Sequence, residues 1–268
     1  MDFRIRAGEK IHVFCDAAET DAVKIAVQNL KNDLKKVADI QVKEEKKVKI
    51  RGGPLGISLK NEEGSLRREA FLLKVEDGIL TIIGTDRRGT IYGVYEFCEQ
   101  IGVSPWYYWA DVPVKKKKEI VFPDGFEQSD YPSVEYRGIF INDEEELDHW
   151  AQAHMNEPTI GVHTYEKIFE LVLRLKGNYI WPAMHVNSFN MCVENGALAD
   201  RMGVVVGTSH CDMLMRSNNR EWIPWITKKG YKDAEYDYSI EGRNRDILKE
   251  YWKESVEQNA DFEVSYTL

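Results

Sequence analysis

One structural unit recurs between Tyr136 and Leu268, and it restricts the possible folds more than any other feature of the sequence. In each copy a short apolar run ends in a cluster of polar side chains, and a helix-like stretch follows. Short buried strands that alternate with helical segments are typical of βα units on a parallel sheet, where reactive groups collect at the carboxyl ends of the strands. The four runs are Tyr136-Arg-Gly-Ile-Phe-Ile-Asn142, Asn178-Tyr-Ile-Trp-Pro182, Val204-Val-Val-Gly-Thr-Ser-His210 and Phe262-Glu-Val-Ser-Tyr-Thr-Leu268.

Helices are expected between these strands, at about 165–176, 196–202 and 241–259. Parallel strands must be joined by crossovers of this kind, so the order of the elements is physically coherent. An open doubly wound sheet and a closed barrel both fit the pattern, because four strands are too few to decide between them.

The first 130 residues predict a separate α/β domain. Thr20 is the expected N-cap of a helix that runs through Val37, and a second helix is expected at 89–101. The predicted strands lie at 10–15, 41–50 and 56–59, and 70–84 predicts a hairpin that turns at Asp77-Gly78. We expect an open sheet of about five strands with two helices on one face, then an ordered crossover at 102–131. The domain boundary is placed near Asp130.

Charge and apolar content limit the partners of the chain. Its net charge of -9 over 268 residues disfavours nucleic acid, and Lys115 to Lys118, its only basic block, predicts a solvated turn between strands. No apolar stretch is long enough to span a bilayer and no signal peptide is evident, so we expect a cytoplasmic protein without a membrane partner. The four cysteines form no C-x-x-C pair, which fits reduced thiols.

The first strand is followed by Asn142-Asp-Glu-Glu-Glu146. Acidic runs are usually solvated loops or the first turn of a helix, where they face the positive end of the dipole. Catalytic groups of parallel-sheet enzymes also occupy this position, so Asp143 and Glu144 are predicted to be catalytic and Asn142 to contact substrate.

The second and third strands end in further polar clusters. Trp181 and His185, followed by Asn187, are suited to stacking on a sugar ring and hydrogen bonding to it; equally, Trp181 could plug a barrel end and His185 could cap a neighbouring helix. After the third strand, Gly207-Thr-Ser-His-Cys-Asp212 places His210 and Asp212 at a strand end. Such a density of reactive groups is difficult to explain by packing.

Two other chemistries are conceivable for these clusters. His185, His210, Cys211 and Asp212 are competent zinc ligands, but no closely spaced histidine pair accompanies them, so no metal or cofactor is predicted. A nucleophile pair of Cys211 and His210 is disfavoured because adjacent residues on a strand point to opposite faces. Paired carboxyl groups remain: Asp143 and Asp212, on different strand ends, could serve as the acid and base of glycoside hydrolysis.

Four motifs occur in the sequence in this order: Gly84-Thr-Asp-Arg-Arg-Gly-Thr-Ile-Tyr-Gly93, Tyr136-Arg-Gly-Ile-Phe-Ile-Asn-Asp-Glu144, Leu175-Lys-Gly-Asn-Tyr-Ile-Trp-Pro-Ala-Met184 and Gly207-Thr-Ser-His210. By these motifs the chain resembles glycoside hydrolase family 115, the xylan α-1,2-glucuronidases. The first motif is only moderately specific, because family 67 glucuronidases and hexosaminidases carry a similar one, whereas the last three in this order are highly specific.

The resemblance implies an N-terminal α+β, sandwich-like accessory domain (1–130) followed by the first half of a (β/α)8 TIM barrel (131–268). It also implies an inverting enzyme that removes glucuronic acid or its 4-O-methyl ether from xylan or its oligosaccharides, with Asp143, Trp181 and His210 in the pocket. The chain departs from the family at Cys211-Asp212-Met213, where a second His and then Glu-Pro are common, and at His185, where an aromatic residue is common.

Family members continue well beyond the position of Leu268, so we expect this chain to be an inactive fragment. The open apolar edge of its unclosed barrel sheet is expected to favour self-association into a homo-oligomer. The alternative function is a non-catalytic carbohydrate-binding module with the same fold.

Overall fold

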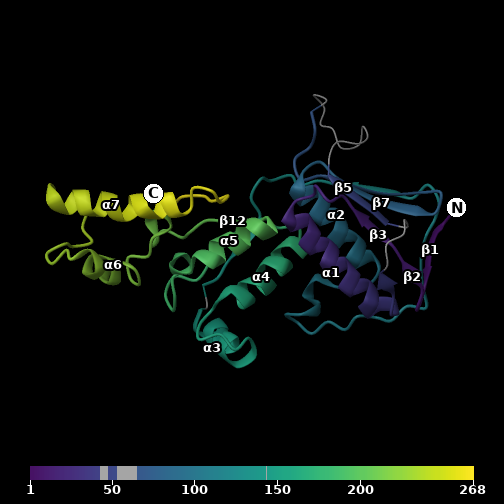
Figure 1. Cartoon of the computed structure of the whole chain (residues 1–268), viewed down its shortest axis with the longest axis horizontal. Coiled ribbons are helices and arrows are strands. Elements are labelled where there is room, and N and C mark those ends of the chain that lie inside the picture. The colour runs from purple at the N-terminus through teal and green to yellow at the C-terminus, as the bar shows by residue number, and fades with distance from the viewer. Residues whose placement is uncertain (43–47, 53–64, 143) are drawn as a thin grey trace. The chain divides into compact units, whose positions relative to one another are not determined.

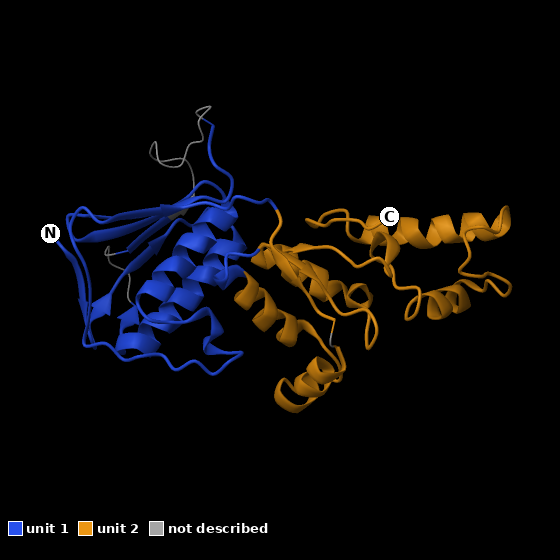
Figure 2. Ribbon diagram, turned by 180° about the vertical axis from the view of Figure 1, so that it is seen from behind, with its two compact units in different colours: residues 1–135, 173–177 blue, residues 136–172, 178–268 orange. Residues whose placement is uncertain are grey.

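The computed structural model describes residues 1–42, 48–52, 65–142 and 144–268, and over these ranges the chain is a mixed α/β protein (Figure 1). It divides into two compact units, one of residues 1–135 and 173–177 and one of residues 136–172 and 178–268 (Figure 2). No helix in the described part is both long and apolar enough to cross a lipid bilayer. The predicted strand at 56–59 and the predicted catalytic residue Asp143 lie outside the described residues.

A five-stranded mixed sheet, close to the predicted one, forms the centre of the first unit. The predicted hairpin is confirmed: its two strands are antiparallel, and Asp77 and Gly78 at the turn have φ values of 50° and 73°. Two-residue hairpin turns favour positive φ at both positions, which suits an Asp-Gly pair. In sheet order the strands are β3 (Val13–Cys15), β5 (Val48–Gly52), β7 (Ile79–Gly84), β6 (Phe71–Glu76) and β9 (Glu127–Asp130).

Two helices, α1 (Asp21–Ala38) and α2 (Arg87–Gln100), cover this sheet. The predicted cap of α1 is confirmed, because the Thr20 hydroxyl accepts a hydrogen bond from the Val23 amide at 3.4 Å. Helix α1 packs on α2, and α2 packs on β6 and β7 (Figure 1).

The prediction for 102–131 was incomplete, because this segment contains strands as well as a connection. Strand β8 (Glu119–Phe122) pairs antiparallel with β1 (Phe3–Arg6), which was not predicted, and β9 pairs with β6. The predicted strand at 10–15 is also divided, since β2 (Lys10–Ile11) pairs in parallel with β4 (Gln41–Val42). Each correction involves a pairing between segments far apart in the sequence.

The second unit contains the predicted parallel strands in sequence order. They are β10 (Gly138–Phe140), β11 (Tyr179–Trp181) and β12 (Val205–Val206), and a parallel bridge from Val206 to Val264 marks the fourth run. The helices α4 (Val162–Arg174), α5 (Val193–Met202) and α7 (Arg243–Gln258) lie where helices were predicted, whereas α3 (Glu144–His154) and α6 (Trp222–Lys229) were not predicted.

One expectation for these strands was wrong. The first run was predicted to be buried, but Ile139 and Phe140 in β10 are 42% and 38% exposed. Strand β10 is the edge of its three-stranded sheet, so a neighbouring strand covers it on one side only.

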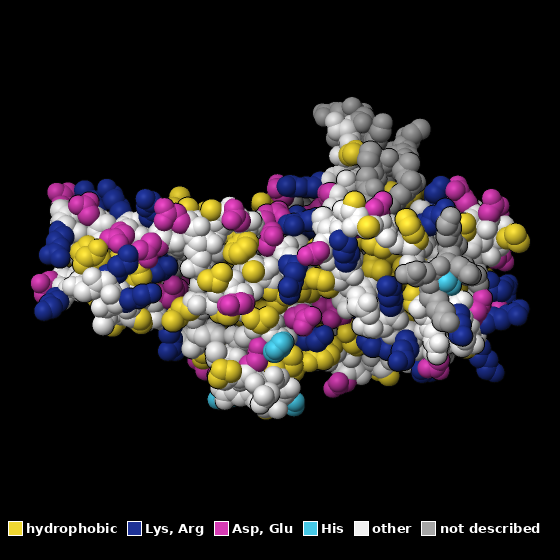
Figure 3. All heavy atoms as spheres, in the orientation of Figure 1, with side chains coloured by type: hydrophobic (Ala, Val, Ile, Leu, Met, Phe, Trp, Pro, Cys, Tyr) yellow, Lys and Arg dark blue, Asp and Glu magenta, His cyan; other side chains and the backbone are white. Residues whose placement is uncertain are grey.

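The outer surface of α6 and α7 carries intermingled basic and acidic side chains (Figure 3). Ion pairs in and next to these helices include Lys229 with Glu250 at 2.8 Å and Arg245 with Glu241 at 3.0 Å. Exposed pairs of this kind contribute little to stability, so the two helices depend mainly on the apolar core beneath them. That core contains Trp222, Trp225, Ile226, Ile247, Leu248 and Tyr251.

Candidate active site

The carboxyl ends of β11 and β12 lie side by side, because the two strands are parallel neighbours. Two further contacts connect the segments that follow them. The Ser209 hydroxyl lies 2.9 Å from the Met184 sulfur, and the Arg220 side chain donates to the His185 carbonyl oxygen. The structure therefore brings together the clusters predicted after the second and third strands.

Glu144, the first residue of α3, is buried beneath the segment that follows β11, with 1% of its surface exposed. Its Oε1 accepts from the Met184 amide at 2.8 Å, and its Oε2 accepts from the His185 and Val186 amides at 2.6 and 2.8 Å. Both carboxyl oxygens are thus occupied by main-chain donors. The observed contacts are structural, and the catalytic role expected of Glu144 stays a prediction.

Trp181 ends β11 in a layer of aromatic side chains. Its indole nitrogen donates to the Tyr179 hydroxyl at 3.2 Å, and its ring centroid lies 5.4 Å from that of Phe140. Gly207 makes room for this layer, since a Cβ atom there would lie 1.8 Å from the Tyr179 hydroxyl oxygen. Trp181 remains partly exposed, so its predicted stacking on a sugar stays a prediction.

The other predicted substrate contacts differ in what surrounds them. Asn142, His185 and His210 are exposed. The Asn187 side chain instead points to the protein, where its amide nitrogen donates to the Thr159 hydroxyl at 3.1 Å and to the Ile160 carbonyl at 2.6 Å.

Asp212 is 5% exposed and lies in a turn that its own main chain stabilises. Its amide donates to the Ser209 carbonyl at 3.1 Å, and its carbonyl accepts from the Thr208 hydroxyl at 2.7 Å. The pKa of the Asp212 carboxyl is raised to about 7, chiefly by burial and then by the negative charges of Glu221 and Glu144, while a hydrogen bond with Ser217 opposes the shift. A carboxyl group in this state can hold a proton at neutral pH.

The sequence argument against a contact between His210 and Cys211 was wrong. Strand β12 ends at Val206, so these two residues lie in a turn, where the alternation of side chains along a strand does not apply. The Cys211 sulfur lies 3.5 Å from the His210 Nε2.

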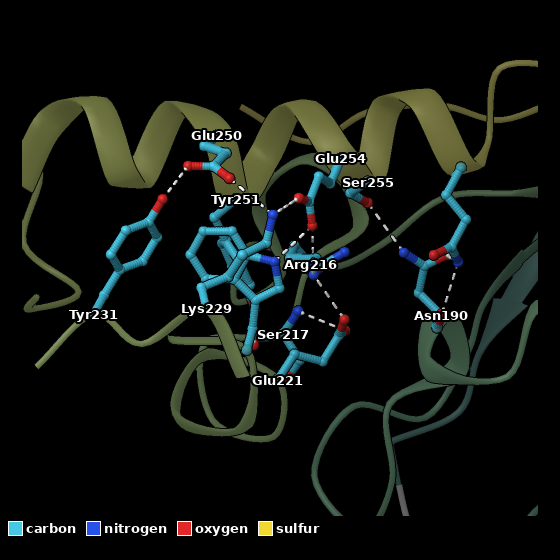
Figure 4. A network of polar contacts seen from close by, with 12 residues as sticks. Asn190, Arg216, Ser217, Glu221, Lys229, Tyr231, Glu250, Tyr251, Glu254 and Ser255 are labelled. Carbon is cyan, nitrogen blue, oxygen red and sulfur yellow. Dashed lines mark hydrogen bonds and ion pairs between the residues drawn. The ribbon is translucent and has the colours of Figure 1, made fainter. Parts of the chain in front are cut away.

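A buried polar network, which the sequence did not predict, holds the segment after Asp212 against α7 (Figure 4). Arg216 pairs with Glu221 at 3.2 Å, and its guanidinium carbon lies 4.4 Å from the Tyr251 ring centroid. Glu221 also accepts from the Ser188 hydroxyl at 2.5 Å, which connects the network to the segment after β11. A Glu followed by Trp222, Trp225 and Ile226 at helical spacing was the available signal for α6.

The described residues contain no group of three or more His, Cys, Asp or Glu side chains placed to hold a metal ion. The zinc hypothesis for His185, His210, Cys211 and Asp212 therefore gains no support from their arrangement.

Comparison with known proteins identifies the family. Residues 129–268 match the model of glycosyl hydrolase family 115. The chain belongs to this family. The resemblance predicted from the motifs after each strand is thereby confirmed, and no curated protein matches the sequence.

The solved structures extend the likeness to the first unit. A family GH115 4-O-methyl-α-glucuronidase, BtGH115A, with specificity for decorated arabinogalactans, is 33% identical over 99% of this chain with a TM-score of 0.87. A GH138 enzyme targeting pectin rhamnogalacturonan II has 14% identity over 95% of the chain and a TM-score of 0.55, which shows likeness of fold alone. The chain spans 36% of the first of these structures and 38% of the second.

Proposed function

We propose that the protein to which this chain belongs is an α-glucuronidase that removes α-1,2-linked glucuronic acid, or its 4-O-methyl ether, from glucuronoxylan or its oligosaccharides. Membership of family 115 and the likeness to a 4-O-methyl-α-glucuronidase support this activity. The second unit is proposed to be the first part of a (β/α)8 barrel, with the N-terminal α/β unit as an accessory domain. The 268-residue chain by itself is proposed to be inactive, because three short strands and one bridge do not close a barrel.

The observation that carries the mechanism is the buried Asp212 carboxyl beside two other acids. Hydrolysis of a glycoside needs one protonated acid for the leaving oxygen and one carboxylate for the attacking water. With its pKa raised to about 7, Asp212 is suited to the first role. Asp143 is proposed as the base, and proton transfer by Glu144 has less support because both of its oxygens accept main-chain hydrogen bonds.

The sugar is proposed to bind between exposed polar side chains and the aromatic layer. His185, His210 and Asn142 are exposed and can hydrogen bond to hydroxyl or carboxylate groups, and the partly exposed Trp181 ring can stack on a pyranose. Asn187 is proposed to support this site rather than to enter it, because its amide nitrogen is bonded to Thr159 and Ile160.

The activity is tested with the full-length enzyme and aldouronic acids prepared from glucuronoxylan. Proton NMR during the first minutes should show release of the β-anomer of the uronic acid, because inversion converts an α-linkage to that product. Release of the α-anomer would exclude the inverting mechanism, and no release would exclude the function.

The substrate backbone needs a separate comparison. The likeness to an enzyme with specificity for decorated arabinogalactans makes that polysaccharide the second candidate. Parallel assays on uronic-acid-decorated xylan and arabinogalactan should give the higher kcat/KM for xylan, and a preference for arabinogalactan would overturn the choice. Calorimetric binding of aldouronic acids without hydrolysis would favour a carbohydrate-binding module instead.

A further inference from the structure

Helix α3 carries two acidic residues, one turn apart, that help to hold the segment after β11, residues 182–188. One contacts this segment directly, and the other contacts residues that bind it. Glu144 accepts the amides of Met184, His185 and Val186. Asp148 lies four residues further along the helix, on the same face. It accepts from the Thr159 hydroxyl at 2.5 Å and from the Ile160 amide at 3.1 Å.

The contact made by Asp148 also reaches the segment after β11. The Asn187 amide nitrogen donates to the Thr159 hydroxyl and to the Ile160 carbonyl. The segment is therefore attached to one helix face twice, through three amides directly and through one side chain by way of Thr159.

The same segment is held from its other side by contacts outside α3. The Arg220 side chain donates to the His185 carbonyl, the Ala183 amide donates to the buried Tyr165 hydroxyl at 3.2 Å, and the Ser188 hydroxyl donates to Glu221. His185 is nevertheless exposed, so its main chain is fixed while its imidazole stays free to meet a ligand.

We propose that Glu144 is a positioning residue, whose carboxylate fixes the main chain of residues 184–186 and thereby holds the His185 imidazole against the sugar. This inference rests on the proposed function, since it assigns His185 to the uronic acid. Three consecutive amides on one carboxylate form a rigid arrangement, because each is a charge-assisted hydrogen bond and the group is almost fully removed from water.

The test is Glu144→Gln in the full-length enzyme, with Glu145→Gln as the matched control. Glu145 is the next residue of the same acidic run and is exposed. A glutamine places an NH2 group where a carboxylate oxygen accepted amides, so exchange of the amide hydrogens of residues 184–186 should accelerate at least about tenfold, while the control leaves it unchanged.

The kinetic readout separates positioning from both proton transfer and simple stability. At a temperature well below unfolding, the KM of Glu144→Gln should rise on the order of tenfold with a smaller change in kcat, because a binding group is displaced and the reacting groups remain. Both limbs of the pH profile should persist. Loss of one limb would make Glu144 a proton-transfer group. Faster exchange with unchanged kinetics would reduce it to a structural residue, and unchanged exchange would show that it does not fix the segment.

The test remains decisive if the variant does not fold or if the enzyme shows no activity. Where Glu144→Gln does not fold, Glu144→Asp keeps the charge but withdraws the oxygens by one methylene, and it should give the same pattern. Where the unmodified enzyme releases no uronic acid, the proposed function fails, and the exchange comparison still decides whether Glu144 fixes the segment.

Discussion

The segment after β10 and the segment after β12 each contain a buried carboxyl group, and the two groups have opposite surroundings. Glu144 is 1% exposed and accepts three main-chain amides, whereas Asp212 is 5% exposed and faces the acids Glu221 and Glu144. Donors satisfy an ionised carboxylate, while neighbouring acids favour the protonated form. Burial is the largest cause of the raised pKa of Asp212 and its acidic neighbours add to it, whereas the main-chain donors around Glu144 make that side chain an anchor for the segment after β11.

The largest difference between the two groups should appear in catalysis. Asp212→Asn removes the proposed acid and should lower kcat of the full-length enzyme by about a thousandfold, as expected for loss of a general acid. Asp261→Asn, at an exposed aspartate, is the control and should leave kcat unchanged. Normal turnover by Asp212→Asn would remove Asp212 from the mechanism.

For stability, we expect the Glu144 side chain to contribute more than that of Asp212. Glu144→Ala leaves three main-chain amides, one buried and two partly buried, without their acceptor and should lower the free energy of unfolding by about 3 kcal/mol. Glu145→Ala should change it by less than about 0.5 kcal/mol, because its side chain is exposed. Chemical denaturation of both variants measures the difference, and equal effects would show that the Glu144 contacts contribute no more than a surface residue.

The charges around Asp212 can be tested through Arg216. Arg216→Leu leaves Glu221 buried without its cation and should lower the free energy of unfolding by about 3 kcal/mol. Arg245→Leu breaks an exposed ion pair with Glu241 and should cost less than about 1 kcal/mol. Denaturation curves that place both variants within about 1 kcal/mol of each other would contradict the buried pairing.

The last prediction concerns stability as a function of pH. The raised pKa of Asp212 means that the folded protein keeps a proton that the unfolded chain loses, so this group costs nothing below about pH 4 and lowers stability progressively up to about pH 7. Asp212→Asn abolishes this cost and should be more stable than the unmodified protein by about 4 kcal/mol at pH 8, but not at pH 4. Thermal unfolding at the two pH values checks this, and a pH-independent difference would contradict it.

Local patterns in the sequence predicted much of the fold. Thr20 marks the start of α1, Asp77-Gly78 marks the hairpin turn, and the apolar runs before Asn142, Pro182 and His210 mark the parallel strands. Each of these signals lies within a few residues of the structure it specifies, so it does not depend on the rest of the chain.

The features that the sequence did not reveal depend on distant partners. Strand β1 is defined by pairing with β8, more than a hundred residues later. Helix α3 was not predicted, because its acidic first turn was interpreted chiefly as a catalytic site after a strand. The role of Glu144 follows from amides 40 to 42 residues away, which no spacing rule indicates.

In the candidate site, too, the position of a residue could be predicted from the local sequence, but its surroundings could not. Asp212 could be named from its place after a strand, but its raised pKa depends on Glu221, at the start of an unpredicted helix. Asn187 was predicted to bind sugar, and its observed bonds to Thr159 and Ile160 could not be read from its position.

The most direct test of this account is a 13C NMR titration of the Asp212 carboxyl carbon in protein labelled at aspartate, with the signal assigned by its absence from Asp212→Asn. The account predicts a midpoint near pH 7. A midpoint near the ordinary aspartate value of about 4 would show that the group is ionised at neutral pH, and Asp212 could then not serve as the proton donor.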